Sequence, residues 1–271
     1  MANVAFLVEY FPGGGVERVI MNLAQPLAER GDKIFLFVHF LTREDLPSGL
    51  PIEYIELPYQ ARSSKNYKFM LNAIKSNHID IFISPGRFPK FLPKMREDGV
   101  CKLAYVLHNS PFYETMEKWG LISHPKENTI KEWLRRWLID YPKFKLGYYD
   151  RKMAKRYEMI YNSVDAYGVL FEDYGRMVAK GLGVPYEESK CVVLQTPIPI
   201  PDNIDVTGPR KKRIIYVGRL DYWQKRIDRL LEVWELIYKD FPEWSLSIVG
   251  SGLELNALKN IVEKNNLQRV E

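Results

Sequence analysis

The sequence is poor in the residues and runs that mark several common classes of protein. Only two cysteines, Cys101 and Cys191, occur in 271 residues, which excludes a disulfide framework and favours a reducing compartment. No apolar run approaches the roughly 18 residues of a membrane-spanning helix. The sequence has neither an Asp-x-Asp pair, the usual carboxylates for a nucleotide-bound divalent cation, nor a His/Cys spacing typical of zinc. We therefore expect a protein without disulfides, membrane spans or a bound metal.

The overall composition is ordinary for a folded protein. Apolar residues make up 46% and charged residues 27%, which excludes a disordered chain, collagen and a coiled coil. The length corresponds to nearly two domains of roughly 150 residues. The N-terminal segment Met1–Val8 lacks the basic start and the cleavage site of a signal peptide, so it is typical of a first buried strand. We expect a cytoplasmic protein, with peripheral contact to the inner face of the membrane as an open alternative.

Short β-rich runs alternate with longer helical patterns along almost the whole chain. The runs are continuous in Val, Ile, Leu, Phe and Tyr, as in strands that are buried on both faces. This alternation predicts an α/β fold with doubly wound parallel sheets and right-handed crossovers. The predicted strands are Val4–Val8, Lys33–Phe40, Ile52–Leu57, Ile79–Ser84, Lys102–Leu107, Ala166–Phe171, Cys191–Leu194, Ile214–Val217 and Ser245–Val249. The clearest predicted helices are Val16–Arg30, Tyr67–Asn77, Tyr174–Gly181, Arg226–Asp240 and Leu253–Asn265.

A proline-rich segment divides the chain. Pro197, Pro199 and Pro201 stand at alternate positions, which neither a helix nor a central strand tolerates. We predict a first domain over 1–195, an extended linker over 196–211 and a second domain over 212–271. The second domain has two complete βα units, too few to bury both faces of a sheet, so we expect it to be incomplete and its strand Ser245–Val249 to have an exposed edge.

The net charge of +5 is concentrated in one stretch. Residues 126–160 contain ten Lys/Arg and five Asp/Glu, and also seven aromatic residues. Trp133, Trp137, Tyr141 and Phe144 recur at spacings of three and four, so they can share one helical face until Pro142 interrupts it. Aromatic rings flanked by Arg135, Arg136, Lys143 and Lys145 suit an anionic membrane surface. The alternative is that the aromatic residues belong to the core and the cations to a solvated face.

The first βα junction contains three consecutive glycines, Gly13, Gly14 and Gly15. Glycines before a helix let backbone N–H groups approach a ligand, and the helix N-terminus adds partial positive charge. The turn therefore suits a phosphate or a sugar hydroxyl, although it matches neither the dinucleotide fingerprint nor the phosphate loop. The alternative is a flexible turn.

A second candidate turn follows the linker. Gly218 and Arg219 leave the carboxyl end of a strand, and Lys225 opens the next helix, so both cations can reach one crevice and hold a diphosphate. The alternative is a pair of solvated surface cations. The turn around Gly250 again places glycines before a helix, which alone is a weak signal.

A third candidate is His108, which ends the strand Lys102–Leu107 and precedes Asn109. The carboxyl end of a strand is where an α/β sheet presents functional side chains, and Asn109 is a possible hydrogen-bonding partner. A single histidine is, however, as compatible with a structural role.

In this order, the motifs resemble those of the retaining glycosyltransferases of family 4, which have the GT-B fold. The resemblance is carried by Gly-Gly-x-Glu-Arg at Gly14–Arg18, by His108 at a strand end, by Gly-Arg-Leu at Gly218–Leu220 with Lys225-Arg226, and by Gly250-Ser251-Gly252. It implies an acceptor-binding first domain, a second domain that binds a nucleotide-sugar, and a cleft between them in which a hexosyl group is transferred without a metal or another cofactor.

The resemblance also implies roles for single residues. Gly14, Gly15, Gly218 and Gly250 would lie on the donor side, His108 would contact the transferred sugar, and Arg219 and Lys225 would neutralise the leaving diphosphate. We place Glu17, Asn109, Trp133, Arg135, Arg136 and Trp137 on the acceptor or membrane side. The expected pathway is surface polysaccharide assembly, with a glycan or lipid-linked acceptor and no nucleic acid as partner.

The sequence also departs from the family. The family has two glutamates separated by seven residues late in its second domain, and this sequence ends before that point. We therefore expect a truncated donor site, a chain that is inactive alone, and self-association through the incomplete second domain as an open possibility. The rival hypothesis is a non-catalytic sugar- or nucleotide-binding subunit that needs a partner chain.

Overall fold

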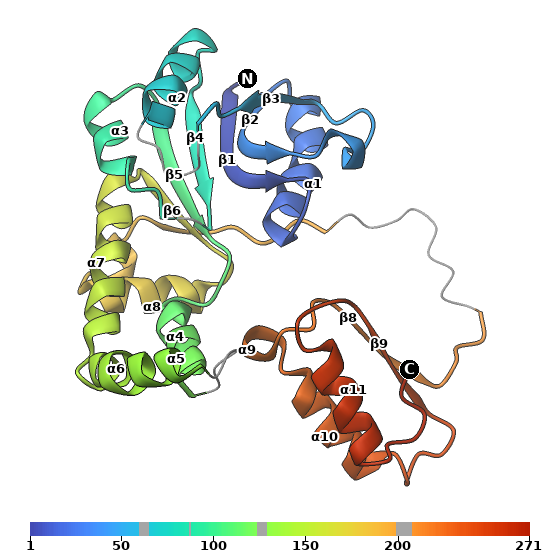
Figure 1. Ribbon diagram of the computed structural model, residues 1–271. Coiled ribbons are helices and arrows are strands. Elements are labelled where there is room, and N and C mark those ends of the chain that lie inside the picture. Colours follow the sequence, from blue (N-terminus) through green and yellow to red (C-terminus); the bar gives the residue numbers. More distant parts are fainter. Residues whose placement is uncertain (60–64, 87, 124–128, 199–207) are drawn as a thin grey trace. The chain divides into compact units, whose positions relative to one another are not determined.

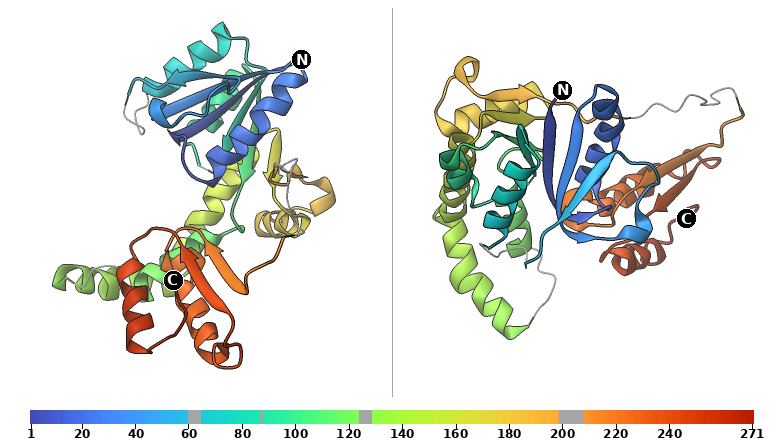
Figure 2. Two further views of the ribbon diagram at one scale, coloured as in Figure 1. Left: turned by 90° about the vertical axis from the view of Figure 1, so that its right-hand side faces the viewer. Right: turned by 90° about the horizontal axis from the view of Figure 1, so that it is seen from above.

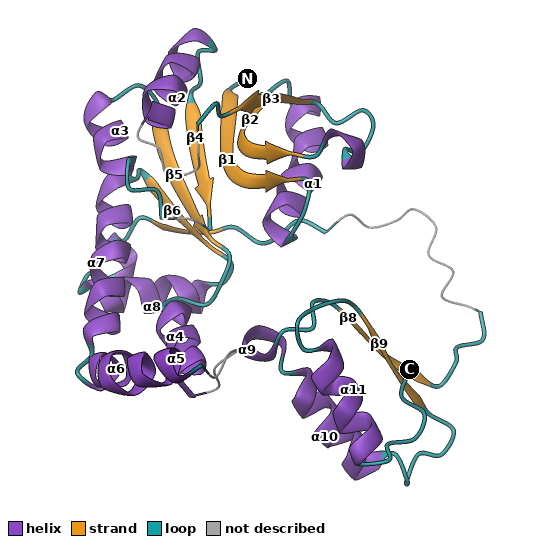
Figure 3. Ribbon diagram, in the orientation of Figure 1, coloured by secondary structure: helices purple, strands orange, loops and turns teal. Residues whose placement is uncertain are grey.

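The chain forms two compact units. The computed structural model describes residues 1–271 except 60–64, 87, 124–128 and 199–207. Contacts within the chain divide it into Met1–Ile200 and Pro201–Glu271. Both units are α/β structures with parallel strands (Figure 3).

The first unit is built on a seven-stranded parallel sheet in the order β3-β2-β1-β4-β5-β6-β7. This doubly wound α/β sheet has the fold class that the alternating pattern predicts. Its strands are β1 (Asn3–Phe11), β2 (Lys33–Leu41), β3 (Ile52–Glu56), β4 (Ile81–Pro85), β5 (Lys102–Leu107), β6 (Ala166–Val169) and β7 (Cys191–Val193). The central strands are buried on both faces because helices cover each side, which explains why they are continuously apolar instead of alternating.

The helices of the first unit lie on both faces of this sheet (Figure 1). Ile20 and Ala24 of α1 (Gly15–Glu29) pack against one face, with Phe6 and Leu36. On the other face, α2 (Lys65–Ser76), α3 (Leu92–Asp98) and α7 (Tyr148–Ser163) contribute side chains to a larger core around Phe82. The remaining helices are α4 (Tyr113–Ser123), α5 (Ile130–Arg135), a π-helical turn (Arg136–Asp140), α6 (Tyr141–Lys145) and α8 (Glu172–Leu182).

Pro142 does not interrupt the helical segment that begins at Ile130, contrary to the expectation from the sequence. The helix runs through α5, the π-helical turn and α6 without a break in helical structure. Pro142 lies in the first turn of α6, where its missing N–H group is tolerated. The wider π-helical turn precedes it and changes the hydrogen-bonding pattern there.

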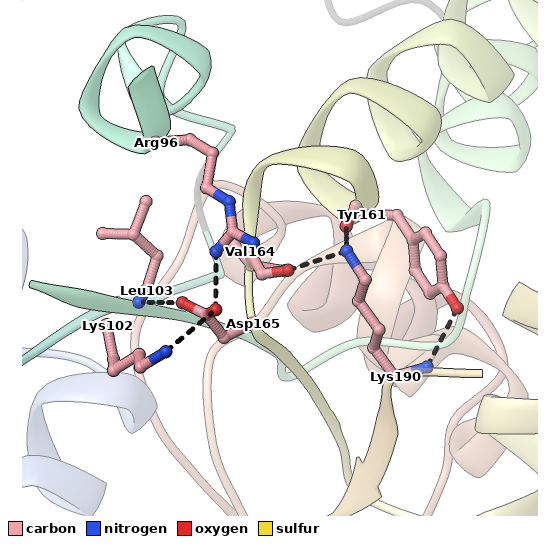
Figure 4. A network of polar contacts seen from close by, with 7 residues as sticks. All are labelled: Arg96, Lys102, Leu103, Tyr161, Val164, Asp165 and Lys190. Carbon is pink, nitrogen blue, oxygen red and sulfur yellow. Dashed lines mark hydrogen bonds and ion pairs between the residues drawn. The ribbon is translucent and has the colours of Figure 1, made fainter. Parts of the chain in front are cut away.

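A polar network at the amino ends of β5 and β6 joins several elements of the first unit (Figure 4). The carboxylate of Asp165 accepts hydrogen bonds from Arg96 Nη1 at 2.5 Å and from the Leu103 N–H at 2.9 Å. Lys190, just before β7, donates from Nζ to the carbonyl oxygens of Tyr161 and Val164 at 3.1 and 2.9 Å. The network ties α3, α7 and the sheet together at the edge opposite the carboxyl ends of the strands.

We expect Asp165→Ala to lower the free energy of unfolding by about 2 kcal/mol, because it removes charge-assisted hydrogen bonds and leaves Arg96 without its partner. Burial opposes ionisation of Asp165, but the Leu103 N–H and Arg96 outweigh it and lower the pKa of this carboxyl. Its stabilising contribution is therefore complete above about pH 4, the range of an unfolded Asp, and is lost as the pH falls through the lower folded pKa.

Urea unfolding of wild type and variant at several pH values between 2.5 and 7 measures this contribution. Glu158→Ala, at an exposed position of α7, is the matched control and should change stability little. A difference between wild type and Asp165→Ala that stays constant down to pH 2.5 would contradict the assigned pKa shift.

The second unit contains a two-stranded parallel sheet, β8 (Arg213–Val217) and β9 (Ser245–Val249), with α9 (Tyr222–Lys225), α10 (Ile227–Ile237) and α11 (Leu255–Lys264). Leu231, Trp234 and Leu258 of the helices pack against Leu246 of the sheet. The sequence led us to expect an exposed edge at β9, but this edge is paired. The chain end pairs with it, because Leu246 N–H donates to the Arg269 carbonyl and Glu271 N–H to the Leu246 carbonyl, both at 2.9 Å.

Candidate functional site

The strand order of the first unit defines a topological switch point between β1 and β4. From β1 the chain winds outward through β2 and β3, and from β4 it winds the other way through β5, β6 and β7. Ligands of doubly wound α/β sheets bind at the carboxyl ends of the strands at such a point. The three glycines follow β1, and Gly86 follows β4, so two glycine turns meet the switch point.

The glycine turn after β1 is open to solvent and leads directly into α1. Gly13, Gly14 and Gly15 are all exposed, and a Cβ added at Gly13 or Gly15 would meet no atom within 4 Å. Gly14 is the N-cap of α1 and supplies no side chain to cap it. Oε2 of Glu17 lies 2.9 Å from the position that a Cβ on Gly14 would take. The carboxylate of Glu17 thus folds back over the helix start, where the helix dipole favours a negative charge.

His108 lies at the same edge as the start of α1. A Cβ added at Gly86, which has a φ of +67°, would lie 3.8 Å from Cγ2 of Val16 and 4.0 Å from Cδ2 of His108. Both side chains therefore flank the same glycine turn. Burial lowers the pKa of His108, so the imidazole is neutral at pH 7 and offers one donor and one acceptor nitrogen.

Asn109, which the sequence predicted at this edge, and Glu114, which it did not, follow His108 along the chain. The side chain of Asn109 forms a hydrogen bond with Tyr113. Burial raises the pKa of Glu114, whose Oε2 accepts a hydrogen bond from the Tyr157 hydroxyl at 3.3 Å. The sequence offered no motif or spacing for Glu114, because its environment is created by α7, more than forty residues further along.

A groove of about 460 Å³ lies between α1 and the connection from β2 to β3. It is lined by Gly13, Arg18 and Asn22 on one side and by Asp45 and Pro47, from the connection between β2 and β3, on the other. The glycine turn therefore borders two regions, this groove toward β2 and the His108 region toward β4.

In the second unit, the two glycine turns pack backbone against backbone at the carboxyl ends of β8 and β9. Gly218 N–H donates to the Val249 carbonyl at 3.0 Å, and Leu220 N–H donates to the Ser251 carbonyl at 2.9 Å. A Cβ on Gly250 would lie 1.9 Å from the Gly218 carbonyl oxygen, and one on Gly252 would lie 2.2 Å from that of Leu220. These glycines are thus required by the contact between the turns, and the N–H of Gly218 is already used within the protein.

Arg219 and Lys225 belong to one short, hydrogen-bonded segment beside these turns. The Asp221 N–H donates to the Arg219 carbonyl, and the Lys225 N–H donates to the Asp221 carbonyl, both at 3.1 Å. Both cationic side chains are exposed. The segment therefore presents two positive charges at the carboxyl edge of β8, where the sequence predicted them.

Arg226, the residue after Lys225, fixes the turn between α9 and α10. It has a left-handed backbone, with φ of 47°, and its guanidinium donates to both carboxylate oxygens of Asp228 at 2.7 to 3.3 Å. Its guanidinium also lies over the ring of Tyr222 at 4.5 Å. Arg226 is thereby held within the fold, whereas the side chain of Lys225 is exposed.

The residues assigned to the acceptor or membrane side differ in their exposure to solvent. Trp133, Arg135 and Trp137 are exposed, whereas Arg136 is buried and does not present its charge at the surface. The alternative that the four aromatic residues belong to the core does not hold for the two tryptophans, whereas Tyr141 and Phe144 are half-buried.

The described residues gather the predicted site into two groups, one per unit. Gly14, Gly15, Glu17, His108 and Asn109 lie at the carboxyl edge of the first sheet, and the second group, Gly218, Arg219, Lys225 and Gly250, lies at that of the second sheet. Among the side chains that the structure describes, no three of His, Cys, Asp or Glu come together as a metal site. None of the described helices combines the length and the apolar character that a membrane span requires.

Comparison with known proteins identifies relatives of both sequence and structure. Residues 202–270 match the family described as glycosyl transferases group 1. Over 57 residues the chain is 42% identical to an uncharacterized glycosyltransferase of Haemophilus influenzae, a match that covers 21% of this chain and 16% of that relative.

Solved structures resemble the chain over nearly its whole length. WaaG, a glycosyltransferase involved in lipopolysaccharide biosynthesis, matches with a TM-score of 0.63 and 17% identity, covering 99% of this chain and 69% of that one. Anabaena Alr3699/HepE in complex with UDP-glucose matches with a TM-score of 0.64 and 13% identity, covering 100% of this chain and 68% of that one. The fold is GT-B, and the matches together support the group 1 glycosyltransferase family. The sequence match to this family lies in the second unit and contains the segment with Arg219 and Lys225.

Proposed function

We propose that the chain carries the acceptor domain and the first part of the donor domain of a retaining glycosyltransferase of family 4. The enzyme would move a hexosyl group from a nucleotide-sugar to a glycan or lipid-linked acceptor in surface polysaccharide assembly. The observation that carries the proposal is the pair Arg219 and Lys225, presented beside two interlocked glycine turns within the region that matches the group 1 family.

The chemistry of the leaving group explains why two cations are needed at this position. When the bond between the sugar and the diphosphate breaks, negative charge develops on the diphosphate oxygens. The planar guanidinium of Arg219 can bind two oxygens at once, and the ammonium of Lys225 adds a point charge. Fixed cations at the site of developing charge stabilise the transition state, which is the role that a metal ion has in other transferases. We therefore propose transfer without a metal or another cofactor.

The first unit would supply the remaining contacts. A neutral His108 can exchange hydrogen bonds with a sugar hydroxyl, because it both donates and accepts. The exposed N–H groups around Gly14 and Gly15 suit an anionic or hydroxyl group of the donor. Glu17 and Asn109, at the same edge, remain our candidates for the acceptor side.

The second candidate function is a non-catalytic subunit that binds a sugar or nucleotide and needs a partner. It is favoured by the uncovered face of the second sheet, where Ile215, Val217 and Val249 are exposed opposite the face that α10 and α11 cover. Apolar strand surface of this kind is normally covered by further chain or by a partner. A second copy of this chain, bound through the same face, is one such partner.

A screen of nucleoside diphosphates and nucleotide-sugars against the chain, in EDTA, tests the proposed function. Hydrogen exchange at residues 218–221 and 250–253 is expected to slow with one class of nucleoside diphosphate, with weak affinity. Protection that requires a divalent cation would contradict the metal-independent mechanism. Protection by free sugars but by no nucleotide would favour the binding subunit.

A further inference from the structure

The segment Ile130–Tyr148, here called the amphipathic tip, carries an uncovered apolar stripe. Ile130, Trp133, Leu134, Trp137 and Leu138 recur at intervals of three and four residues, the spacing of one face of a helix. Every one of them is exposed, Ile130 to 81% and Leu138 to 70%. A stripe of this kind normally faces the core of a globular protein. In the described part of the first unit it faces solvent instead.

The tip lies apart from the sheet and belongs to a helical group at one end of α7. Figures 1 and 2 show α5 and α6 projecting away from the strands in each view. Leu146, which follows α6, is also exposed, to 71%. The stripe is therefore carried by helices that lie away from the sheet, and its side chains are exposed.

Contacts from α4 and α7 hold the tip in a defined orientation. The carboxylate of Asp140 accepts a hydrogen bond from the Tyr149 hydroxyl at 2.6 Å and lies 3.2 Å from Lys118 Nζ. Trp119 of α4 stacks on Phe144 of α6, with ring centroids 4.9 Å apart. The apolar stripe is thus presented by a helix that is already fixed, so little ordering has to accompany binding to a surface.

Cations surround the stripe and indicate the chemistry of what covers it. Lys131, Arg135, Lys143 and Lys145 are exposed. Of the two carboxylates in the segment, Glu132 is exposed and Asp140 is engaged in the contacts just described, so the exposed charge is predominantly positive. Lys143 and Lys145 lie over the rings of Tyr148 and Tyr141, at 5.5 and 5.7 Å from their centroids. Tryptophan, tyrosine and lysine side chains beside aliphatic ones are the set that suits a membrane–water interface.

We propose that the amphipathic tip docks on an anionic lipid bilayer, with the stripe in the interfacial layer and the flanking cations on the lipid headgroups. The positive charge around the stripe favours this occupant over a second copy of the chain, because two copies would bring their cations together. Docking itself stands apart from the proposed function. A further consequence rests on the proposed function: docking would bring the acceptor edge of the first unit to a lipid-linked acceptor.

Sedimentation of the 271-residue chain with vesicles tests the proposal. We expect binding to vesicles that contain phosphatidylglycerol, weaker binding at 0.5 M NaCl, and little binding to vesicles of phosphatidylcholine alone. W137E/L138E should lower the fraction bound to anionic vesicles at least tenfold, and K143E/K145E should remove most of its dependence on anionic lipid. Phe69→Glu and K68E/K75E, at exposed positions of α2, are the matched apolar and charge controls and should bind as wild type.

Several outcomes would overturn the proposal. These are no binding of the wild type, equal and salt-insensitive binding to both kinds of vesicle, or unchanged binding of W137E/L138E with circular dichroism like that of wild type. A wild type that is dimeric without lipid and becomes monomeric in W137E/L138E would assign the stripe to a second copy. Nucleotide protection of residues 218–221, measured in parallel, reports on the proposed function independently of lipid.

Discussion

An R219A/K225A double variant is expected to lose between about 10² and 10³ in the rate of sugar transfer, measured in a protein whose second unit is completed to the length of its family. Removing a fixed group that stabilises developing charge costs about 3–4 kcal/mol in the transition state. The loss should appear mainly in kcat, because the charge on the diphosphate is greatest as the bond breaks.

The geometry of the segment makes the two residues act together. Two successive backbone hydrogen bonds connect Arg219 to Asp221 and Asp221 to Lys225. They hold the backbone of the two cationic residues in one defined turn. The Arg226–Asp228 pair then fixes the following turn. Because both side chains would contact one diphosphate, the effects of the single variants should not add to that of the double variant.

Steady-state kinetics of wild type, the two single variants, R219A/K225A and a control double variant tests this expectation. R229A/K239A removes two exposed cations from the same unit, at positions away from the glycine turns, and should behave as wild type. Equal urea unfolding of the proteins excludes a loss of folding as the cause. A rate of R219A/K225A within about threefold of wild type would mean that the two residues are solvated surface cations with no role in transfer.

Much of the fold follows from the sequence because strands that are buried on both faces must be continuously apolar. All nine predicted strands are present, some with ends shifted by one to three residues. The sequence predicted no bounds for α4 and only a shared helical face for the amphipathic tip, and apolar side chains of both are exposed. Their periodicity therefore does not reveal which face is buried, and neither the π-helical turn nor the tolerated Pro142 has a sequence signal.

The position of the candidate site residues in the fold was predictable where it depends on short segments next to strand ends. The glycine turns, Arg219 and His108 are such cases, because the carboxyl edge of a parallel sheet collects whatever follows its strands. Burial that depends on distant elements was not predictable. Arg136 is buried although its neighbour Arg135 is exposed, and burial raises the pKa of Glu114, although the hydrogen bond from Tyr157 opposes this shift. The glycine at position 250 was interpreted as a ligand contact, whereas its close approach to Gly218 is a sufficient reason for a glycine there.

The 271-residue chain by itself is expected to transfer sugar at least 10³-fold more slowly than a full-length relative assayed with the same donor. Correct positioning of two reactants accounts for about 7–11 kcal/mol of a barrier, so a donor held only at its diphosphate gains little of it. The described part of this chain offers Arg219 and Lys225 for the diphosphate, and Gly14, Gly15 and His108 at the edge of the first sheet. The chain covers 69% and 68% of the WaaG and HepE chains.

The second unit is also expected to be less stable locally than the first, because apolar side chains on one face of its sheet are exposed. With Ile215, Val217 and Val249 exposed on one face of β8 and β9, hydrogen exchange in these strands should be faster than in β1 and β2, whose side chains are buried on both sides. Release of labelled sugar from a panel of nucleotide-sugars measures transfer and hydrolysis together, and His108→Ala is the control for contaminating enzymes. Turnover by the purified chain that disappears in His108→Ala would show that the groups described here suffice for catalysis. The donor would then be positioned by these two sheet edges alone, contrary to the mechanism proposed above.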